Sequence, residues 1–385
     1  MAITQSTTAG SPSPSGLLAE MQSRVPQMVE QLSEFVNLES PSLDVAHLQR
    51  SAKYLADLFA EVTGTKAEII PGANGPHVHW KGSDDTKVLI VGHHDTVFPL
   101  GTTATRPFSI DGDIARGPGI FDMKAGIVQA IHGLSAVREA CHVEVLITAD
   151  EEVGSYSSRD LIEERARATG AVLVLEPSAD GGALKIARKG VGTFTVQIAG
   201  RASHAGLEPE KGINALIELA TQVQRIVAMA RPKLGTTVTP TVATAGNAEN
   251  VVPDAAMIKV DVRVVLPEEK DRIEREMSQL KAFIDGAVIK VSGSVNRPPM
   301  HESAGRKLFG VAEIVARDLG IKNLQGVAVG GGSDGNFTAA IGVPTLDGMG
   351  AVGGGAHGVT EHVLISTMAE RAALVAGVAR ALVNR

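Results

Sequence analysis

The sequence contains very little cysteine and few aromatic side chains. Its 385 residues include one cysteine, one tryptophan and two tyrosines, and aromatic residues make up 3% of the chain. A single cysteine excludes an internal disulfide and suits a reducing compartment. That residue, Cys141, stands just before an expected strand, and nothing around it recommends it as a nucleophile. We therefore disfavour both a disulfide-stabilised scaffold and thiol chemistry.

Long apolar runs and an excess of basic charge are also missing. No apolar stretch approaches the roughly 20 residues that a membrane-spanning helix needs. The net charge is −7, which argues against nucleic acid or an anionic membrane as a partner. The opening segment MAITQSTTAGSPSPSG lacks the basic and apolar parts of a signal peptide. We expect a flexible tail over residues 1–20 and a cytoplasmic location.

What the sequence does contain is a series of acidic and histidine residues that follow apolar segments or lie in glycine-rich turns. The apolar run at residues 88–91 predicts a buried strand. His93 and Asp95 follow it, at the end of the strand where open α/β sheets bind their ligands. A short His-x-Asp sequence also arises by chance, so this pair needs support from other segments.

Acidic residues in two further segments supply some of that support. Asp122 precedes an expected helix over residues 125–138, and by itself it would be an ordinary helix N-cap. Glu151 and Glu152 follow another apolar strand, and their ordinary interpretation is a solvated loop before the next helix. However, Asp150, Glu151 and Glu152 are three consecutive acids beside a buried strand. Their charges repel one another, and a multivalent cation would relieve that repulsion.

Two more candidates complete the series. Glu176 ends the apolar segment 171–175, and Pro177 keeps it at the end of that strand. His357 stands in the glycine-rich stretch GGGAHG. Each candidate has an ordinary explanation when taken alone. Five positions of metal-ligand type at strand ends or turns do not share one, so together they predict a metal site.

At this point the sequence resembles the two-zinc aminoacylase/carboxypeptidase family of metallopeptidases, most closely its bacterial glutamate carboxypeptidase (folate-hydrolysing) branch. The matching segments are GHHDTV, GPGIFDMKAG, TADEEVGSYSSRDL, VLEPS, GRASHAG and GGGAHG, in the order of the family. The set is highly specific, and the resemblance runs from about Met28 to the C-terminus.

The resemblance implies two zinc ions in each subunit, with cobalt or manganese as alternative metals. The implied ligands are His93, Asp122, Glu152, Glu176 and His357. Asp122 would bridge the two ions, with room for a water between them, and a cis peptide often follows this aspartate in the family. His93 and Glu176 would complete the first site, and Glu152 and His357 the second. His362 is the alternative to His357, but its surroundings look like an ordinary helix start.

The resemblance also implies three residues that take part in the reaction. Glu151 would be the general base, which takes a proton from the attacking water and delivers it to the leaving amine. Asp95 would orient His93. His204, which would otherwise be an ordinary loop histidine, would reach the active site of a partner subunit and stabilise the developing oxyanion.

Recognition of a free carboxylate is implied by a second set of residues. Arg263 and Asn250 match positions that bind the substrate carboxylate, and Arg297 matches a third position less closely. A bidentate arginine suits a carboxylate, although an exposed strand arginine is common without a ligand. The glycine-rich loop at residues 329–336 would line the same pocket.

The order of elements and the resemblance together predict an α/β fold in two domains. A catalytic domain, with a mixed sheet covered by helices on both faces, would span residues 21–188 and 299–385. A ferredoxin-like α+β domain with the order β-α-β-β-α-β would be inserted at residues 189–298. The resemblance assigns this insert to dimerisation or to a lid. A long helix over residues 363–382 would end the chain.

The leading interpretation is a zinc-dependent hydrolase that cleaves the amide bond next to a free carboxylate. Its substrate would be a small N-acyl amino acid, a dipeptide-like molecule or a folate-like molecule, from which it releases glutamate or another amino acid. The first alternative is an N-acyl-amino-acid deacylase or deacetylase. The second is a catalytically silent metal- or peptide-binding relative, against which the intact Glu151 counts. A homodimer is expected in each enzyme interpretation.

Overall fold

The computed structural model describes residues 11–385 and divides into two compact units. We call residues 11–187, 302–329 and 333–385 the first unit, and residues 188–301 with 330–332 the second unit. Residues 1–10 of the predicted tail lie outside the described part. Within residues 11–385, no helix has both the length and the apolar character of a membrane span.

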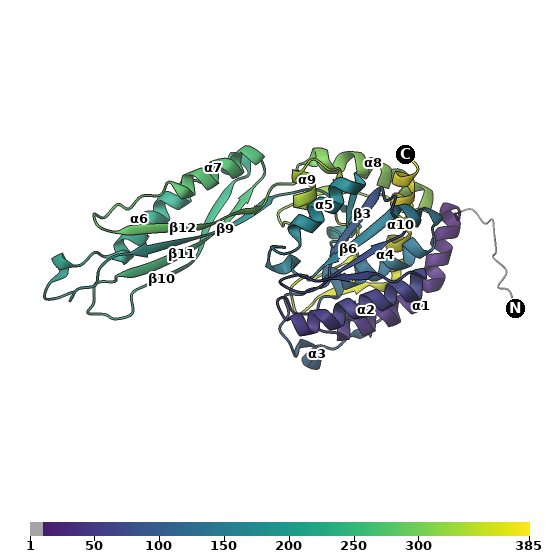
Figure 1. The fold of residues 1–385 in the computed structure, drawn as a ribbon, viewed down its shortest axis with the longest axis horizontal. Helices are drawn as coiled ribbons and strands as arrows, with labels where there is room; N and C mark the ends of the chain where they lie inside the picture. The colour runs from purple at the N-terminus through teal and green to yellow at the C-terminus, as the bar shows by residue number, and fades with distance from the viewer. Residues whose placement is uncertain (1–10) are drawn as a thin grey trace. The chain divides into compact units, whose positions relative to one another are not determined.

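A six-stranded mixed sheet forms the centre of the first unit (Figure 1). In spatial order its strands are β1 (Glu68–Ile70), β2 (His77–Lys81), β6 (Val143–Thr148), β3 (Val88–His93), β7 (Val172–Val174) and β14 (Thr345–Leu346). β3 is parallel to β6 and β7, and β14 is parallel to β7. β1 and β2 pair antiparallel at the other edge.

Helices cover both faces of this sheet, as the predicted fold class requires. One layer contains α1 (Pro14–Asn37), α2 (Val45–Thr63), α4 (Ala125–Ser135), α8 (Glu302–Leu319) and α10 (Met368–Val383), and the other contains α5 (Arg159–Thr169) and α9 (Gly335–Ala340). Successive residues of β3 face opposite layers: Ile90 packs in the core under the first, whereas Leu89 and Val91 pack in the core under the second. Because both faces are buried, β3 is apolar at every position before Gly92.

Short elements surround the central sheet. They are α3 (Thr102–Thr105), β4 (Ser109–Asp111), β5 (Ile114–Arg116), β8 (Leu184–Arg188), β13 (Gly326–Val329), β15 (Gly353–Gly354) and β16 (His362–Leu364). β15, β16, β5 and β4 form a small antiparallel sheet in that order, and β13 pairs with β8.

The prediction of a flexible tail is wrong from Pro14 onward, because α1 begins there. Ser13 caps the helix: its side chain accepts a hydrogen bond from the N–H of Gly16. Leu17 and Met21 are fully buried in the main core. The polar, proline-containing composition predicted disorder, but the apolar face of the following turns has a core to pack against.

The predicted helix over residues 363–382 begins too early. The structure starts α10 at Met368, and residues 362–364 instead form β16, which pairs with β5. The sequence shows the apolar residues of this segment but not the neighbouring strand with which they pair. Strand pairing is a long-range contact, so local periodicity does not reveal it.

The second unit is a four-stranded antiparallel sheet with two helices on one face. Its elements in chain order are β9 (Gly190–Ala199), α6 (Ala215–Val227), β10 (Thr237–Ala245), β11 (Ala255–Val264), α7 (Pro267–Ser278) and β12 (Val288–Arg297). The spatial order is β10-β11-β9-β12, and the core contains Phe194, Val196 and Ile198 from β9. This is the β-α-β-β-α-β arrangement that the predicted fold class contains.

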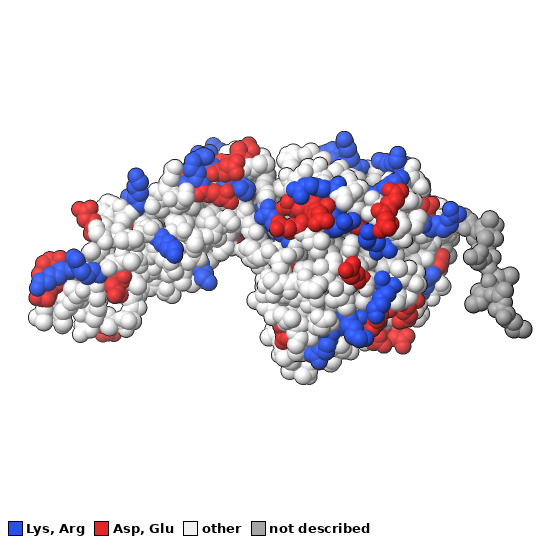
Figure 2. Space-filling view, viewed as in Figure 1, with Lys and Arg blue, Asp and Glu red and all other residues white. Residues whose placement is uncertain are grey.

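One buried carboxylate ties α7 to the start of β10. Glu269 is 2% exposed and accepts hydrogen bonds from Arg272, Arg231 and Thr236, the last at 2.7 Å. These contacts, with Arg272 contributing most, lower the pKa of Glu269 to about 2. The outer surface of α7 carries both signs of charge (Figure 2), and Lys270 pairs there with Glu274.

We predict that Glu269→Gln lowers the stability of the second unit by on the order of 3 kcal/mol at pH 7, because it leaves the buried guanidinium of Arg272 with Glu276 alone as a carboxylate partner. Since the folded-state pKa is below the ordinary 4.5, the contribution is complete above that pH and disappears as the pH falls towards 2. Urea unfolding followed by circular dichroism measures the loss, while the only tryptophan, Trp80, reports the first unit. Glu268→Gln, at an exposed neighbouring position, is the control; equal effects of the two changes would contradict the prediction.

Candidate metal centre

Five segments of the first unit bring the predicted metal ligands together. The parallel strands β6, β3 and β7 end side by side, and three of the residues come from these ends: His93 is the last residue of β3, Glu152 follows β6 and Glu176 follows β7. Asp122 lies in the turn before α4, and His357 lies in the loop between β15 and β16. Neighbouring strand ends explain why residues far apart in sequence meet here.

The side chains form two sets that share Asp122. In the first set, His93 Nε2 lies 3.1 Å from Asp122 Oδ1 and 3.7 Å from Glu176 Oε1. In the second set, His357 Nε2 lies 3.3 Å from Asp122 Oδ2 and 3.1 Å from Glu152 Oε1. Each oxygen of Asp122 therefore faces a different imidazole.

These distances fit divalent metal ions. Zinc bound about 2.1 Å from each ligand atom in a tetrahedral site separates those atoms by roughly 3.4 Å. The four distances of 3.1 to 3.7 Å lie around this value. Each set offers one imidazole nitrogen and two carboxylate oxygens, which zinc, cobalt and manganese all accept. The residues present therefore fit two ions with Asp122 between them.

His93 is held in the orientation that a ligand needs. Its Nδ1 lies 3.0 Å from the backbone carbonyl of Asp95 and 3.4 Å from the carboxylate of Asp95. Both partners are acceptors, so they favour a proton on Nδ1 and leave Nε2 to face the metal position. His93 and Asp95 are almost completely buried, which keeps this geometry rigid.

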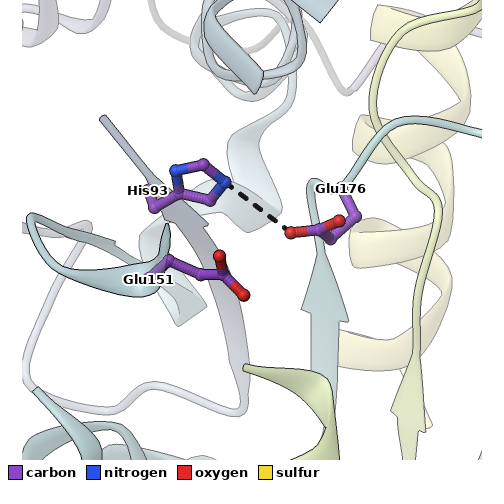
Figure 3. Close-up of side chains that lie close together, drawn as sticks. All are labelled: His93, Glu151 and Glu176. Atoms are coloured by element: carbon purple, nitrogen blue, oxygen red, sulfur yellow. Dashed lines mark ion pairs between the residues drawn. The ribbon is translucent and has the colours of Figure 1, made fainter. Parts of the chain in front are cut away.

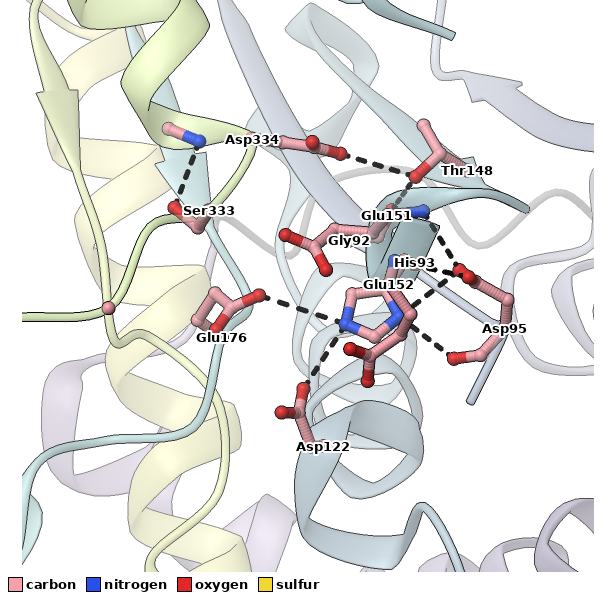
Figure 4. A network of polar contacts seen from close by, with 12 residues as sticks. Gly92, His93, Asp95, Asp122, Thr148, Glu151, Glu152, Glu176, Ser333 and Asp334 are labelled. Atoms are coloured by element: carbon pink, nitrogen blue, oxygen red, sulfur yellow. Dashed lines mark hydrogen bonds and ion pairs between the residues drawn. The ribbon is translucent and has the colours of Figure 1, made fainter. Parts of the chain in front are cut away.

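Asp95 also holds the loop that carries the two adjacent glutamates (Figure 4). Its carboxylate accepts hydrogen bonds from the backbone N–H groups of Glu151 and Glu152, at 3.1 and 3.2 Å, and from the hydroxyl of Ser42 at 2.8 Å. The Glu151 carboxylate points towards His93 and Glu176 (Figure 3), and all three have ligand-type atoms within 4.8 Å of one another. A base at Glu151 would therefore lie next to the reacting atoms.

Two further buried acids hold the same loop, and neither was a candidate ligand in the sequence. Asp150 accepts hydrogen bonds from Ser157, Ser158 and the side chain of Asn74. Asp334 accepts from the hydroxyls of Ser155 and Thr148, which lie on either side of the two glutamates. Asp150 was visible only as one of three consecutive acids, and the expectation for Asp334 was a pocket-lining loop.

A third missed residue is Glu361. Its carboxylate is 2% exposed and accepts hydrogen bonds from the backbone N–H groups of Gly119, Phe121 and Asp122. Burial raises its pKa to about 7 in the metal-free protein, although the three N–H groups oppose this. The expectation of a helix start at residues 361–363 concealed this role, because an acid in a first helical turn needs no other explanation.

The geometry excludes the N-cap alternative for Asp122 and shows the surroundings of His362. The N-cap of α4 is Lys124 and not Asp122, whose carboxylate faces the imidazoles. His362 belongs to β16, and its Nδ1 lies 2.9 Å from the carbonyl of Thr360. The peptide bond between Asp122 and Met123 is cis, as the resemblance implied.

The remaining predicted site residues lie in the second unit. His204 is in the loop after β9, and Asn250 is in the loop after β10. These two loops pair: the carbonyl of Asn250 accepts the N–H of Ala205 at 2.9 Å. Arg263 and Arg297 stand near the other end of the sheet, in β11 and β12.

Contacts between imidazoles and carboxylates shift the pKa values of the groups in this centre. Hydrogen bonds that the His357 ring donates to the carboxylates of Asp122 and Glu152 raise the pKa of His357 to about 10. Although burial opposes it, contact with Asp122 and Asp95 also holds the pKa of His93 well above its usual value. Conversely, the two imidazoles keep the pKa of Asp122 below its usual value despite burial. Protons on the imidazoles thus balance the carboxylates, and bound metal would have to displace them.

We predict that zinc uptake by the metal-free protein at pH 7 releases the His357 proton, and that affinity at the second site rises about tenfold per pH unit up to about pH 10. The measurement combines a pH indicator in weak buffer with an ion count by chelator competition. His357→Asn should lose one ion and release fewer protons, whereas His362→Asn should behave as the wild type. If His357→Asn takes up as many ions and releases as many protons as the wild type, the assignment of His357 as a ligand is contradicted.

Comparison with known proteins agrees with this geometry. The sequence model of peptidase family M20/M25/M40 matches residues 89–381. Carboxypeptidase G2 from Pseudomonas sp. (strain RS-16) is 32% identical over 361 residues, which cover 90% of this chain and 87% of that protein. Acetylornithine deacetylase from Myxococcus xanthus is 26% identical over 292 residues, covering 68% and 73%.

A solved structure shows the same fold. An M20 family metallo-carboxypeptidase from Sulfolobus solfataricus superposes with a TM-score of 0.73 at 16% identity, covering 93% of this chain and all of that one. The family match extends across both units and includes every candidate metal ligand. The chain therefore belongs to peptidase family M20/M25/M40, a family of metal-dependent hydrolases.

Proposed function

We propose that the protein is a two-zinc amidohydrolase that cleaves the amide bond next to a free carboxylate and releases a C-terminal amino acid, glutamate being our first choice. The observation that carries the proposal is the pair of ligand sets that share Asp122, with Glu151 beside them. The 32% identity to carboxypeptidase G2 supports this reaction class. The single cysteine supports a reducing compartment such as the cytoplasm.

The protein supplies a base and its support next to the metal positions. When bound, the two ions would polarise the scissile carbonyl and make a water easier to deprotonate. Glu151 would take the proton of that water and pass it to the leaving amine. Asp95 keeps Glu151 in place through the backbone N–H at 3.1 Å, so the base cannot drift from the reacting atoms.

Arg263 and Arg297 form a cationic position on the second unit. Arg263 in β11 and Arg297 in β12 both pair with Val191 of β9, the strand between them, so they share one level of the sheet and one face. Arg263 makes two hydrogen bonds to Asp261, at 3.0 and 2.9 Å, and its side chain is 32% exposed. This pairing fixes the guanidinium plane while donors remain available for a substrate carboxylate.

His204 is prepared to donate from a defined nitrogen. Its Nδ1 accepts the backbone N–H groups of Gly206 and Leu207, each at 3.1 Å. A neutral ring with an accepting Nδ1 carries its proton on Nε2. His204 would therefore present an N–H donor to a developing oxyanion without first changing tautomer.

The positions of these residues within the second unit favour a dimer. His204 and Asn250 lie at the end of the sheet where Ala199 pairs with Ala255, whereas Arg263 lies at the opposite end. The eight residue-to-residue steps along β11 from Ala255 to Arg263 span roughly 27 Å. One carboxylate cannot reach both Asn250 and Arg263 of the same unit. If both act on one substrate, they come from different subunits.

Exposed apolar side chains that are close to the ligands in sequence support an apolar acyl group. Large apolar side chains stand exposed within a few residues of the ligands: Val97 is 42% exposed, Leu100 54%, Tyr156 74% and Val359 79%. Such side chains would contact an aromatic or aliphatic acyl group better than an acetyl group. This observation favours folate-like or other large acyl substrates over the deacetylase alternative that acetylornithine deacetylase suggests.

We predict that Glu151→Gln lowers kcat by about 10²- to 10⁴-fold, because the amide cannot accept the proton of the attacking water. Metal content, measured by atomic absorption, should remain at the wild-type value. Glu164→Gln, at a side chain that is 72% exposed, is the control and should keep full activity. Wild-type turnover by Glu151→Gln would remove Glu151 from the reaction.

The substrate proposal is tested with a panel of acyl groups crossed with leaving amino acids, analysed by liquid chromatography. We expect hydrolysis of N-aroyl-glutamates, its loss after chelation and its recovery with zinc. A clear preference for acetyl groups would favour the deacetylase alternative. If the fully metallated protein hydrolyses no N-acyl amino acid, the silent relative is the correct interpretation.

The dimer proposal is tested by mixing two inactive variants. A Glu151→Gln subunit combined with a His204→Asn subunit forms one intact site if His204 acts across the interface. After complete subunit exchange, about a quarter of the wild-type activity should return, because half of the dimers are mixed and each has one intact site. If His204 acts within its own subunit, no mixed dimer has an intact site and no activity returns.

A further inference from the structure

We propose that Glu361 is a positioning residue that sets the second metal site by holding the turn that presents Asp122. The inference rests on the proposed two-metal centre. Glu361 would act through Asp122 and through the chain segment that carries His357. Its effect should therefore fall on one ion more than on the other.

The contacts of Glu361 converge on a single turn. Oε1 accepts the N–H of Phe121 at 2.9 Å and that of Asp122 at 3.0 Å, while Oε2 accepts the N–H of Gly119 at 3.0 Å. Both carboxylate oxygens are thus occupied by backbone donors. One of those donors belongs to the residue whose carboxylate lies between the two imidazoles.

This turn needs an external acceptor because its backbone is irregular. Gly119 has a φ of 71°, and Asp122 has φ −114° and ψ 92°, so neither continues a regular helix. The regular hydrogen bonds of α4 begin only after its start at Ala125. Buried N–H groups outside regular structure need a partner, and Glu361 provides one for three of them.

Glu361 also joins the segments that carry two of the three ligands of the second site, Asp122 and His357. It follows His357 by four residues, and the next residue, His362, pairs with Arg116 at the end of β5, just before the turn. Arg106 adds a hydrogen bond to the carbonyl of Gly358 at 3.1 Å. The distance of 3.3 Å between His357 Nε2 and Asp122 Oδ2 thus depends on contacts that include Glu361.

The first site has a different support. His93 is the last residue of β3, and Glu176 follows the adjacent strand β7 in the central sheet. Asp95 holds the ring of His93 from the other side. Of the first set, only Asp122 depends on the turn that Glu361 holds. A change at Glu361 should therefore weaken the second ion while largely sparing the first.

The test compares zinc binding by the chelator-stripped wild type and by Glu361→Gln. The glutamine has the same length but presents an NH₂ group to backbone donors. We expect the wild type to bind two ions per subunit, and Glu361→Gln to bind its second ion roughly 10- to 100-fold more weakly while the first remains within about threefold. Chelator competition measures both affinities, and cobalt absorption reports the coordination of each ion without any activity assay.

Two variants separate positioning from general loss of stability. Glu361→Asp keeps the charge and both oxygens on a shorter stem, so it should recover part of the affinity for the second ion; it also carries the comparison if Glu361→Gln does not fold. Glu218→Gln removes another fully buried carboxylate that accepts backbone N–H groups, those of Phe283 and Ile284 in the second unit. This control should leave both ion affinities unchanged.

The outcomes distinguish this inference from the proposed function. If the wild type binds fewer than two ions, the two-metal centre itself fails. If the wild type binds two ions and Glu361→Gln binds both as tightly, or loses both equally, the positioning role of Glu361 is overturned. Selective loss of the second ion, absent in Glu218→Gln, supports it.

Discussion

The shared carboxylate of Asp122 is the constraint on which the rest of the site depends. One oxygen faces His93, which ends a strand of the central sheet, and the other faces His357, which lies in a loop more than 230 residues later. Both imidazoles must reach their positions for the two halves of the centre to exist. The fold meets this requirement by ending β6, β3 and β7 side by side and by pairing β16 with β5.

The acids around this centre stabilise the loops although they repel one another. Asp95, Asp150, Asp334 and Glu361 are all nearly inaccessible to solvent, and each accepts hydrogen bonds from backbone groups, hydroxyls or an amide in a neighbouring loop. A carboxylate offers several lone pairs and no donor, so it can hold several N–H groups of an irregular turn at once. The divalent ions of the proposed centre would offset the accumulated negative charge. Loop geometry and metal binding therefore support each other.

In the proposed enzyme the second unit would contribute groups of a different kind. Its sheet places His204 and Asn250 at one end and Arg263 and Arg297 at the other. The two ends of the sheet are too far apart to meet at one substrate. One copy of this unit would therefore act at two separate positions. In the proposed dimer, each copy would supply one end of the sheet to its own subunit and the other end to the partner.

Much of the first unit follows from local sequence. The apolar run before His93 predicted a buried strand, and β3 is one, with successive residues in opposite cores. The candidate segments were identified because each stands at a strand end or in a glycine-rich turn. The resemblance then selected His93, Asp122, Glu152, Glu176 and His357 among them, and these residues lie together. The order of strands and helices in the insert was likewise visible in its periodicity, since a small antiparallel sheet with one covered face alternates apolar and polar residues.

The sequence by itself determined which residue types were available for chemistry and which strands they follow, since both depend on neighbours in the chain. Only the tertiary structure decided which acids bind backbone and which face the metal positions. Asp150, Asp334 and Glu361 are acids of the same types as the proposed ligands. Asp334 and Glu361, however, accept hydrogen bonds from residues that are distant in sequence. The buried start of α1 and the short strand β16 were decided in the same way. Packing and strand pairing are long-range contacts, and no local pattern specifies which distant segment will provide them.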